Sequence, residues 1–220
     1  MSGRAVGAPD LARLRSLADL SDVDLGVVLL RGTPTNQSRT TETLRSISAR
    51  AQEFGRDLAA RFGAGTTDGE DGHAQAAGHR MTVVEHRDGL ASGDPAVARF
   101  SHRTRTVDLY LDTVVFCEDL VDRLDWRQSY PPGSVRSAAL EHERAHDLIS
   151  HAHARELRIA VGEAAISLGR WRRWAHIAGA DELAAHAFAQ HVLGLGRSPL
   201  LVTAAAATAL DQVRRPAKES

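Results

Sequence analysis

The segment ALEHERAHDLISHAHAREL, residues 139–157, contains four histidines and four acidic residues within nineteen positions. Its HERAH sequence places His142, Glu143 and His146 in the spacing H-E-x-x-H. Residues four apart lie on one face of a helix, so both imidazoles could bind one Zn²⁺ ion at about 2.0–2.1 Å. The carboxylate beside the first histidine could then reach a zinc-bound water. This spacing predicts metal-assisted hydrolysis, with Glu143 as the general base.

The alternative interpretation is a helix whose histidines are ordinary surface residues. The chain has 11 histidines, so the spacing can arise by chance. His142 and His146 nevertheless share their helical face with the apolar Val135 and Ile149. Because an unpaired imidazole is costly to bury, we favour a zinc site.

A catalytic zinc site normally has three protein ligands, so HERAH needs a further donor. His153 lies on the same face, but it is 11 residues beyond His142, about 16 Å along the axis at 1.5 Å per residue. The metzincin pattern would need a glycine at 149 and a histidine at 152, where the chain has Ile149 and Ala152. We therefore look for the third ligand in a distant segment, ADELAAHAFAQHVLGLGRSP, residues 180–199, which has helical spacing.

HERAH followed by this second segment resembles the ImmA/IrrE-type metallopeptidases of the gluzincin group. Their pattern is H-E-x-x-H, then a helix of the form E-x-E-A-N-x-F-A. Glu182 matches its first glutamate and the Phe188-Ala189 pair its F-A, whereas Ala184 replaces the second glutamate and His186 the asparagine. The resemblance covers roughly residues 105–199.

The resemblance implies that Glu182 is the third zinc ligand, with Asp181 and His186 as alternatives. It also implies a zinc-dependent peptidase that acts on a peptide or protein substrate, such as a regulatory protein. A zincin-fold binding protein without turnover is the second hypothesis, because the sequence departs from the family pattern. A non-haem metal protein with a helical bundle core is the third hypothesis. Such a bundle needs a second E-x-x-H on another helix, and none of the other predicted helices contains one.

The elements before HERAH are predicted from apolar spacing and from turn residues. Leucines at every third position predict a helix over residues 9–20, and VDLGVVLLRG, residues 23–32, is interpreted as a short buried strand. Helical spacing then covers residues 41–62, and residues 63–79 are interpreted as an exposed mobile loop. We expect strands in MTVVEH, residues 81–86, and in residues 97–116.

Within that last segment, residues 107–112 alternate between apolar and other side chains, as in a half-buried strand. Its edge is a candidate for pairing with an extended peptide. After PPG the chain is predicted to be helical, with Ser134 as the first N-cap. The expected helices are residues 134–153, 155–177, 181–194 and 199–214.

This order predicts an α+β fold of zincin-like type. A small, mostly antiparallel sheet should pack against the active-site helix, followed by a helical C-terminal half. Residues 1–40 are expected to form an N-terminal helix and arm, and residues 41–220 a single metallopeptidase domain.

GRWRRWAH, residues 169–176, mixes arginine with tryptophan and could mark a nucleic-acid surface. Helical spacing favours a different interpretation, in which Trp171 and Trp174 are core residues and the arginines are solvated. Four residues are candidates for stabilising negative charge on a substrate oxygen: Tyr110, Tyr130, His176 and His186.

Composition limits the remaining function classes. The formal net charge of −1 gives no general attraction to nucleic acid or to an anionic membrane, so we expect neither as a partner. Cys117 is the only cysteine, which excludes an internal disulfide and a thiolate cluster. Without a signal-like N-terminus or an apolar run of about 18 residues, the expected localisation is cytoplasmic. The sequence predicts no particular oligomeric state.

Overall fold

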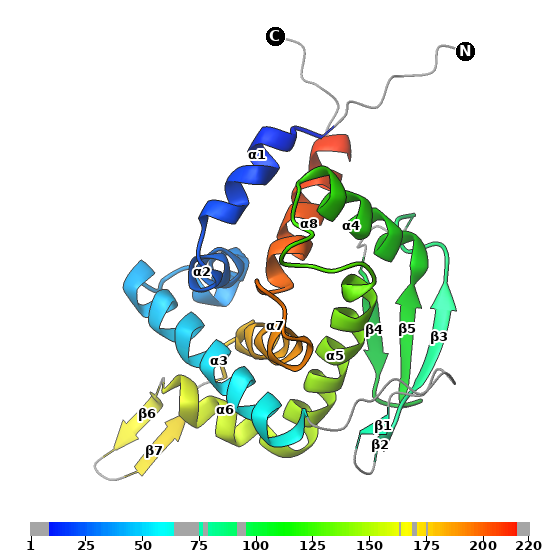
Figure 1. The fold of residues 1–220 in the computed structure, drawn as a ribbon. Helices are drawn as coiled ribbons and strands as arrows, with labels where there is room; N and C mark the ends of the chain where they lie inside the picture. Colours follow the sequence, from blue (N-terminus) through cyan, green and yellow to red (C-terminus); the bar gives the residue numbers. More distant parts are fainter. Residues whose placement is uncertain are drawn as a thin grey trace.

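The computed structural model describes residues 9–63, 81–91, 96–162 and 176–214 with their side chains. It also describes the backbone of residues 75–76, 79–80, 164–168 and 171–174. Most of these residues are helical, and a three-stranded sheet lies at one side of the helices (Figure 1). The predicted α+β class is therefore confirmed.

The first helix, α1 (Leu11–Arg15), begins where the Asp10 side chain accepts hydrogen bonds from two backbone amides, and the 3₁₀-helix η1 (Ser16–Asp19) continues it. The strand predicted for residues 23–32 is wrong, because this segment forms helix α2 (Asp22–Gly32). The Ser21 side chain caps α2 by accepting from the amide of Asp24, and short apolar runs do not distinguish strand from helix.

Helix α3 (Thr41–Phe62) has the predicted bounds and follows the 3₁₀-helix η2 (Pro34–Asn36). Thr40 caps it by accepting from the amide of Thr43. Gly26 allows α2 to pack closely on α3, since a Cβ there would clash with the Ser48 hydroxyl. Both helices contribute buried leucines to the main core.

Strands β3 (Thr82–His86), β4 (Ala98–Ser101) and β5 (Thr106–Tyr110) form a sheet in the order β3-β5-β4. β3 is parallel and β4 antiparallel to β5, so the sheet is mixed, not mostly antiparallel. As the alternation predicts, Val107 and Leu109 are fully buried. The peptide-binding edge predicted for this strand is wrong, because β5 is paired on both sides and β3 and β4 form the edges. Alternation indicates a half-buried strand but does not identify its neighbours.

Two short strands, β1 (Gln75–Ala76) and β2 (His79–Arg80), pair within the predicted 63–79 loop. The rest of that loop beyond Gly63 lies outside the described residues. Helix α4 (Leu111–Arg123) follows β5 directly, so the end of the segment 97–116, in which strands are predicted, is helical.

The histidine-rich segment forms helix α5 (Ser134–Leu148), a π-helix (Ile149–His153) and helix α6 (Ala154–Val161). Gly133, with φ +82°, occupies the N-cap position that was predicted for Ser134. The helix predicted for residues 155–177 is wrong: α6 ends at Gly162, whose φ is +77°, a conformation that favours glycine.

A hairpin of β6 (Ala164–Leu168) and β7 (Trp171–Trp174) follows, so the helical interpretation of the tryptophans fails. Their side chains lie outside the described residues.

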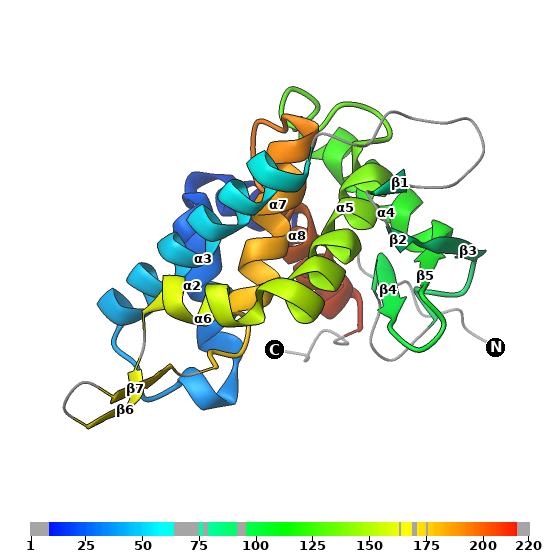
Figure 2. The same cartoon turned by 90° about the horizontal axis from the view of Figure 1, so that it is seen from below.

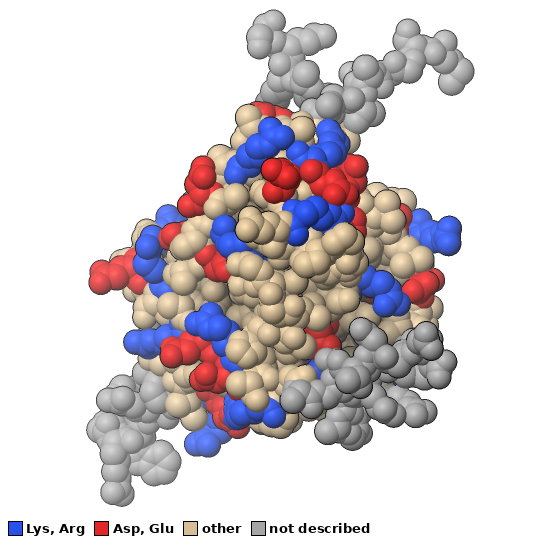
Figure 3. Space-filling view, in the orientation of Figure 1, with Lys and Arg blue, Asp and Glu red and all other residues tan. Residues whose placement is uncertain are grey.

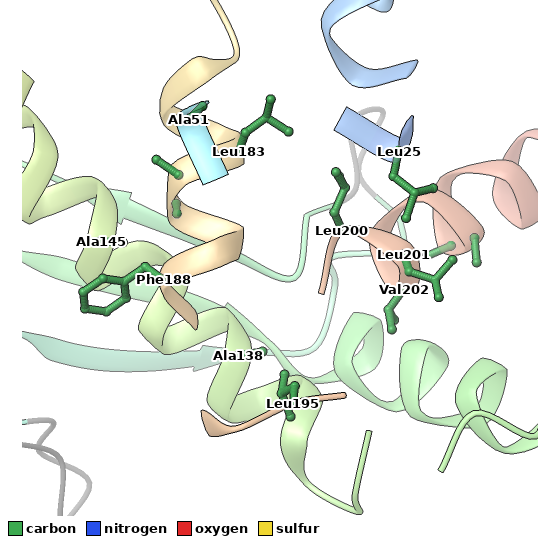
Figure 4. Packing of buried hydrophobic residues seen from close by; sticks show 14 of the residues in the cluster. Leu25, Ala51, Ala138, Ala145, Leu183, Phe188, Leu195, Leu200, Leu201 and Val202 are labelled. Carbon is green, nitrogen blue, oxygen red and sulfur yellow. The ribbon is translucent and has the colours of Figure 1, made fainter. Parts of the chain in front are cut away.

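Helices α7 (Ala180–Leu193) and α8 (Leu200–Arg214) match the predictions within one residue at each end. α7 packs against both α3 and α5 (Figure 2). The buried Leu183 and Phe188 of α7 pack in one core with residues of α5 and α8 (Figure 4). α5 also packs against β4. The histidine helix therefore lies between α7 and the edge of the sheet.

On the face shown in Figure 3, basic and acidic side chains of described residues lie side by side around a central area of other residues. None of the described helices combines the length and the apolar character that crossing a membrane requires.

Candidate metal centre

The carboxylate of Glu182, in the first turn of α7, lies between two imidazoles of α5. Its Oε2 is 3.2 Å from Nε2 of His142, and its Oε1 is 3.2 Å from Nε2 of His146. In a tetrahedral zinc site, ligand atoms about 2.0–2.1 Å from the metal are about 3.3 Å apart. Each of these separations therefore suits a zinc ion held between the carboxylate and that imidazole.

The charge state of the centre also suits a cation. Burial alone would lower the pKa of His142, but the neighbouring carboxylates of Glu143 and Glu182 raise it to about 9. Partial burial would raise the pKa of Glu182, yet His142 and His146 hold that pKa far below the usual range. The metal-free centre is thus a protonated imidazole beside a carboxylate. A metal ion would replace the proton on His142.

Nε2 of His142 is buried and makes no hydrogen bond, although it lies close to Glu182. An ion pair without hydrogen-bond geometry only partly offsets the cost of burying this nitrogen. A metal ion between Nε2 and the carboxylate would satisfy both groups. Together with the His₂-carboxylate donor set, which zinc prefers, this buried nitrogen indicates that the residues fit the metal.

His186 lies on α7 one turn after Glu182, and its ring centroid is 4.4 Å from that of His142. One potential ligand atom from each of these three residues lies within 4.8 Å of the other two. Burial lowers the pKa of His186 well below its usual value, and the neighbouring His142 lowers it further. His186 is therefore a neutral imidazole, and its buried Nδ1 makes no hydrogen bond. Of the two alternatives to Glu182, the structure brings His186 to the centre.

Asp181 is not grouped with these ligand atoms. It lines a second cavity, of about 250 Å³, together with His146 and His176. His153 is distant from the centre, as the helix geometry predicts. Its Nδ1 lies 3.0 Å from a carboxylate oxygen of Glu156, and its ring packs against Phe62.

Glu143 is only 9% exposed. Its Oε2 accepts a hydrogen bond of 3.0 Å from the backbone amide of Phe100 in β4, and its Oε1 lies 3.5 Å from Nδ1 of His142. It lines the same cavity as His142, Glu182 and His186. The sheet edge therefore positions the predicted general base beside the predicted ligands. No pattern of side chains predicts this contact, because it uses the main chain of Phe100.

That cavity has a volume of about 360 Å³. Its wall beyond the centre is largely apolar and includes Leu29, Val97, Ala98, Val135, Ala138 and Leu200. Tyr130 also lines it, but its hydroxyl donates a hydrogen bond of 2.7 Å to the carbonyl of Ser198. Tyr110 instead packs against the ring of His86. Among the four candidates for stabilising charge, His186 has its ring 4.4 Å from that of His142, whereas His176 lines the other cavity with His146.

The centre thus joins two imidazoles, one carboxylate and a second carboxylate at the end of an apolar cavity. This arrangement can hold a divalent metal ion and move a proton next to it. Comparisons of the chain with family models, with curated proteins and with solved structures found no match.

Proposed function

We propose that the protein is a zinc-dependent metallopeptidase that hydrolyses a peptide bond. The observation that carries the proposal is the carboxylate of Glu182, each of whose oxygens lies 3.2 Å from Nε2 of one HERAH histidine. The sheet edge beside the histidine helix agrees with a zincin-like fold. The resemblance of HERAH and residues 180–199 to the ImmA/IrrE-type peptidases points the same way.

His142, His146 and Glu182 would hold the zinc ion. When bound, zinc supplies Lewis acidity, which polarises the substrate carbonyl and lowers the pKa of an attacking water. Glu143 accepts the proton of that water and returns it to the leaving amine. The hydrogen bond from Phe100 holds Oε2 of this carboxylate, so Oε1, which lies 3.5 Å from Nδ1 of His142, would transfer the proton.

The cavity walls favour a peptide with an apolar side chain next to the scissile bond, because they are lined mainly by aliphatic residues. β4 is an edge strand, and its residue Ala98, with the preceding Val97, lines this cavity. An extended substrate could pair with such an edge. His186 is placed to donate a hydrogen bond to the substrate oxygen as negative charge develops. From the family resemblance, a regulatory protein is the proposed substrate.

A zinc-binding protein without turnover is the second candidate function. His186 favours it, since a fourth protein ligand would close the coordination sphere, as in structural zinc sites. Ala184, in place of the family's second glutamate, favours it as well.

The discriminating experiment measures zinc content and cleavage of a peptide library for the wild type and for Glu143→Gln. The wild type should cleave peptides only with zinc present. Glu143→Gln should retain zinc and lose about 10²- to 10⁴-fold in rate, the usual contribution of general acid–base catalysis. Full activity in Glu143→Gln would refute the general-base role. A zinc-loaded wild type that cleaves nothing would favour the binding protein.

A further inference from the structure

A second group of potential metal ligands lies outside the candidate centre. His102 is in the turn between β4 and β5, Asp147 is near the end of α5, and His151 is in the π-helix. One ring nitrogen of each histidine and one oxygen of Asp147 all lie within 4.8 Å of one another. The centroids of the two imidazole rings are 5.4 Å apart, and the rings are tilted by 47° to each other. His102 comes 45 positions before Asp147 in the sequence, so distant segments converge here.

The carboxylate of Asp147 is the buried part of this group, at 6% exposure. Its Oδ2 pairs with Arg105 at 3.2 Å. Its Oδ1 is buried and makes no hydrogen bond, although it lies 3.1 Å from Nδ1 of His151. That nitrogen is equally close, at 3.1 Å, to the main-chain carbonyl of Asp147. Because Oδ1 is buried and its contact with His151 lacks hydrogen-bond geometry, its burial is only partly compensated. Oδ1 is therefore an acceptor suited to a bound cation.

The separation between Asp147 and His151 agrees with this assignment. Oδ1 of Asp147 and Nδ1 of His151 are 3.1 Å apart, close to the spacing of about 3.3 Å between ligands of a tetrahedral zinc ion. His151 also lies in a π-helix, a local widening of the helix that is frequent at functional sites. The two histidines are exposed, so an ion can reach the group from solvent.

We propose that His102, Asp147 and His151 form a second metal site, which takes a divalent transition-metal ion such as Zn²⁺. Two imidazoles and one carboxylate are ligands that zinc prefers, whereas calcium and magnesium require mainly oxygen donors. Arg105 occupies Oδ2, which leaves one oxygen of Asp147 for the metal and adds a repulsive positive charge. The second site should therefore bind more weakly than the first.

An ion at this site would link the end of β4 to the end of α5. His102 directly follows β4, in which Phe100 donates to Glu143, and its ring packs against that of Phe100. The ion would fasten the strand that positions Glu143 to the helix that carries it. Its role is structural, and it does not depend on hydrolysis at the first centre.

The test counts the Zn²⁺ ions bound per chain, by calorimetric titration and elemental analysis of the full-length protein. The double variant His102→Ala/His151→Ala changes two exposed side chains, so folding should be preserved, which circular dichroism checks. It should bind one ion fewer than the wild type: one instead of two, or none instead of one if the first centre holds no zinc. The difference therefore tests the second site separately from the proposed peptidase function.

The matched control is His153→Ala, which removes a histidine of the same π-helix that contacts Phe62 and Glu156. It should bind as many ions as the wild type. The single variant His102→Ala should weaken the second site at least about 10-fold, since even changes next to metal ligands cost that much. Equal numbers of ions in the wild type and the double variant would overturn the proposal.

Discussion

At the scale of single residues, the candidate centre brings opposite charges together before any metal is bound. His142 is held in its protonated form by two carboxylates, and Glu182 is held ionised by two imidazoles. Protons and metal ions therefore compete for the same nitrogen. This competition makes metal binding depend on pH.

Zinc binding at pH 7 is expected to release about one proton, because the pKa of His142 in the metal-free protein is about 9. The apparent affinity should fall about tenfold for each pH unit below that value. Calorimetric titration in two buffers with different ionisation enthalpies measures the released protons. The variant His102→Ala/His151→Ala isolates the first centre for this measurement. Binding enthalpies that do not depend on the buffer would contradict the expectation.

The sequence indicated these residues to different degrees. His142, Glu143 and His146 followed from local spacing, because one helical turn brings residues four apart to one face. Glu182 is on another helix and was indicated only by the family resemblance. The spacing of Asp147 and His151 is also four, but no local pattern reveals that the turn before β5 adds His102.

At the scale of elements, Glu182 is positioned by the close packing of α7 on α3. Gly55 of α3 faces the main chain of α7, and a Cβ at this position would clash with the carbonyl of Ala184. Only glycine lets the two helices approach so closely. The position of the third predicted ligand thus depends on a residue of α3 that makes no contact with the centre.

Gly55→Ala should lower the free energy of unfolding of the metal-free protein by about 1–3 kcal/mol, the usual cost of overpacking. It should also weaken zinc binding, since α7 must shift together with Glu182. Urea denaturation and zinc titration measure the two effects. Gly32→Ala is the matched control: a Cβ at Gly32 meets no atom within 4 Å, so it should cause no loss. Equal stability of both variants would rule out the packing argument.

The elements predicted correctly are those with long periodic patterns and clear end signals. α3 has a threonine cap and a glycine end, and α7 lies between Gly179 and Gly194, both with positive φ. The errors fall where periodicity is ambiguous. The apolar run of α2 fits either a helix or a strand. The segment after Gly162 has an apolar spacing that suits a hairpin as well as a helix. Whether two strands pair in parallel or antiparallel depends on tertiary contacts, and the alternation of side chains does not indicate these contacts.

At the scale of the whole molecule, the N-terminal helices share a core with the helices that carry the centre. Leu14 and Leu25 belong to the same buried cluster as Leu183 and Leu201. Asp22, at the start of α2, accepts hydrogen bonds from Arg197 and from the amide of Ser198, in the connection between α7 and α8. The first 40 residues, which were predicted as a helix and an arm, therefore help to hold α7.

Arg197→Ala should destabilise the protein by about 2 kcal/mol, within the range for hydrogen bonds of charged groups. It removes the ion pair with Asp22 and the hydrogen bonds to the carbonyls of Ala18 and Leu20. Arg155→Ala, an exposed arginine of α6, serves as the control and should stay within about 0.5 kcal/mol. Thermal and urea unfolding compare the two. If Arg197→Ala lowers the free energy of unfolding no more than the control does, the hydrogen bonds of Arg197 contribute little to stability.

The most direct test of the centre is diffraction at the zinc absorption edge from crystals of the protein grown with zinc. An anomalous peak should lie between α5 and α7, with Nε2 of His142, Nε2 of His146 and a carboxylate oxygen of Glu182 as its nearest protein atoms. Zinc that fills the His102 site alone, with Glu182 turned away from both imidazoles, would contradict the account.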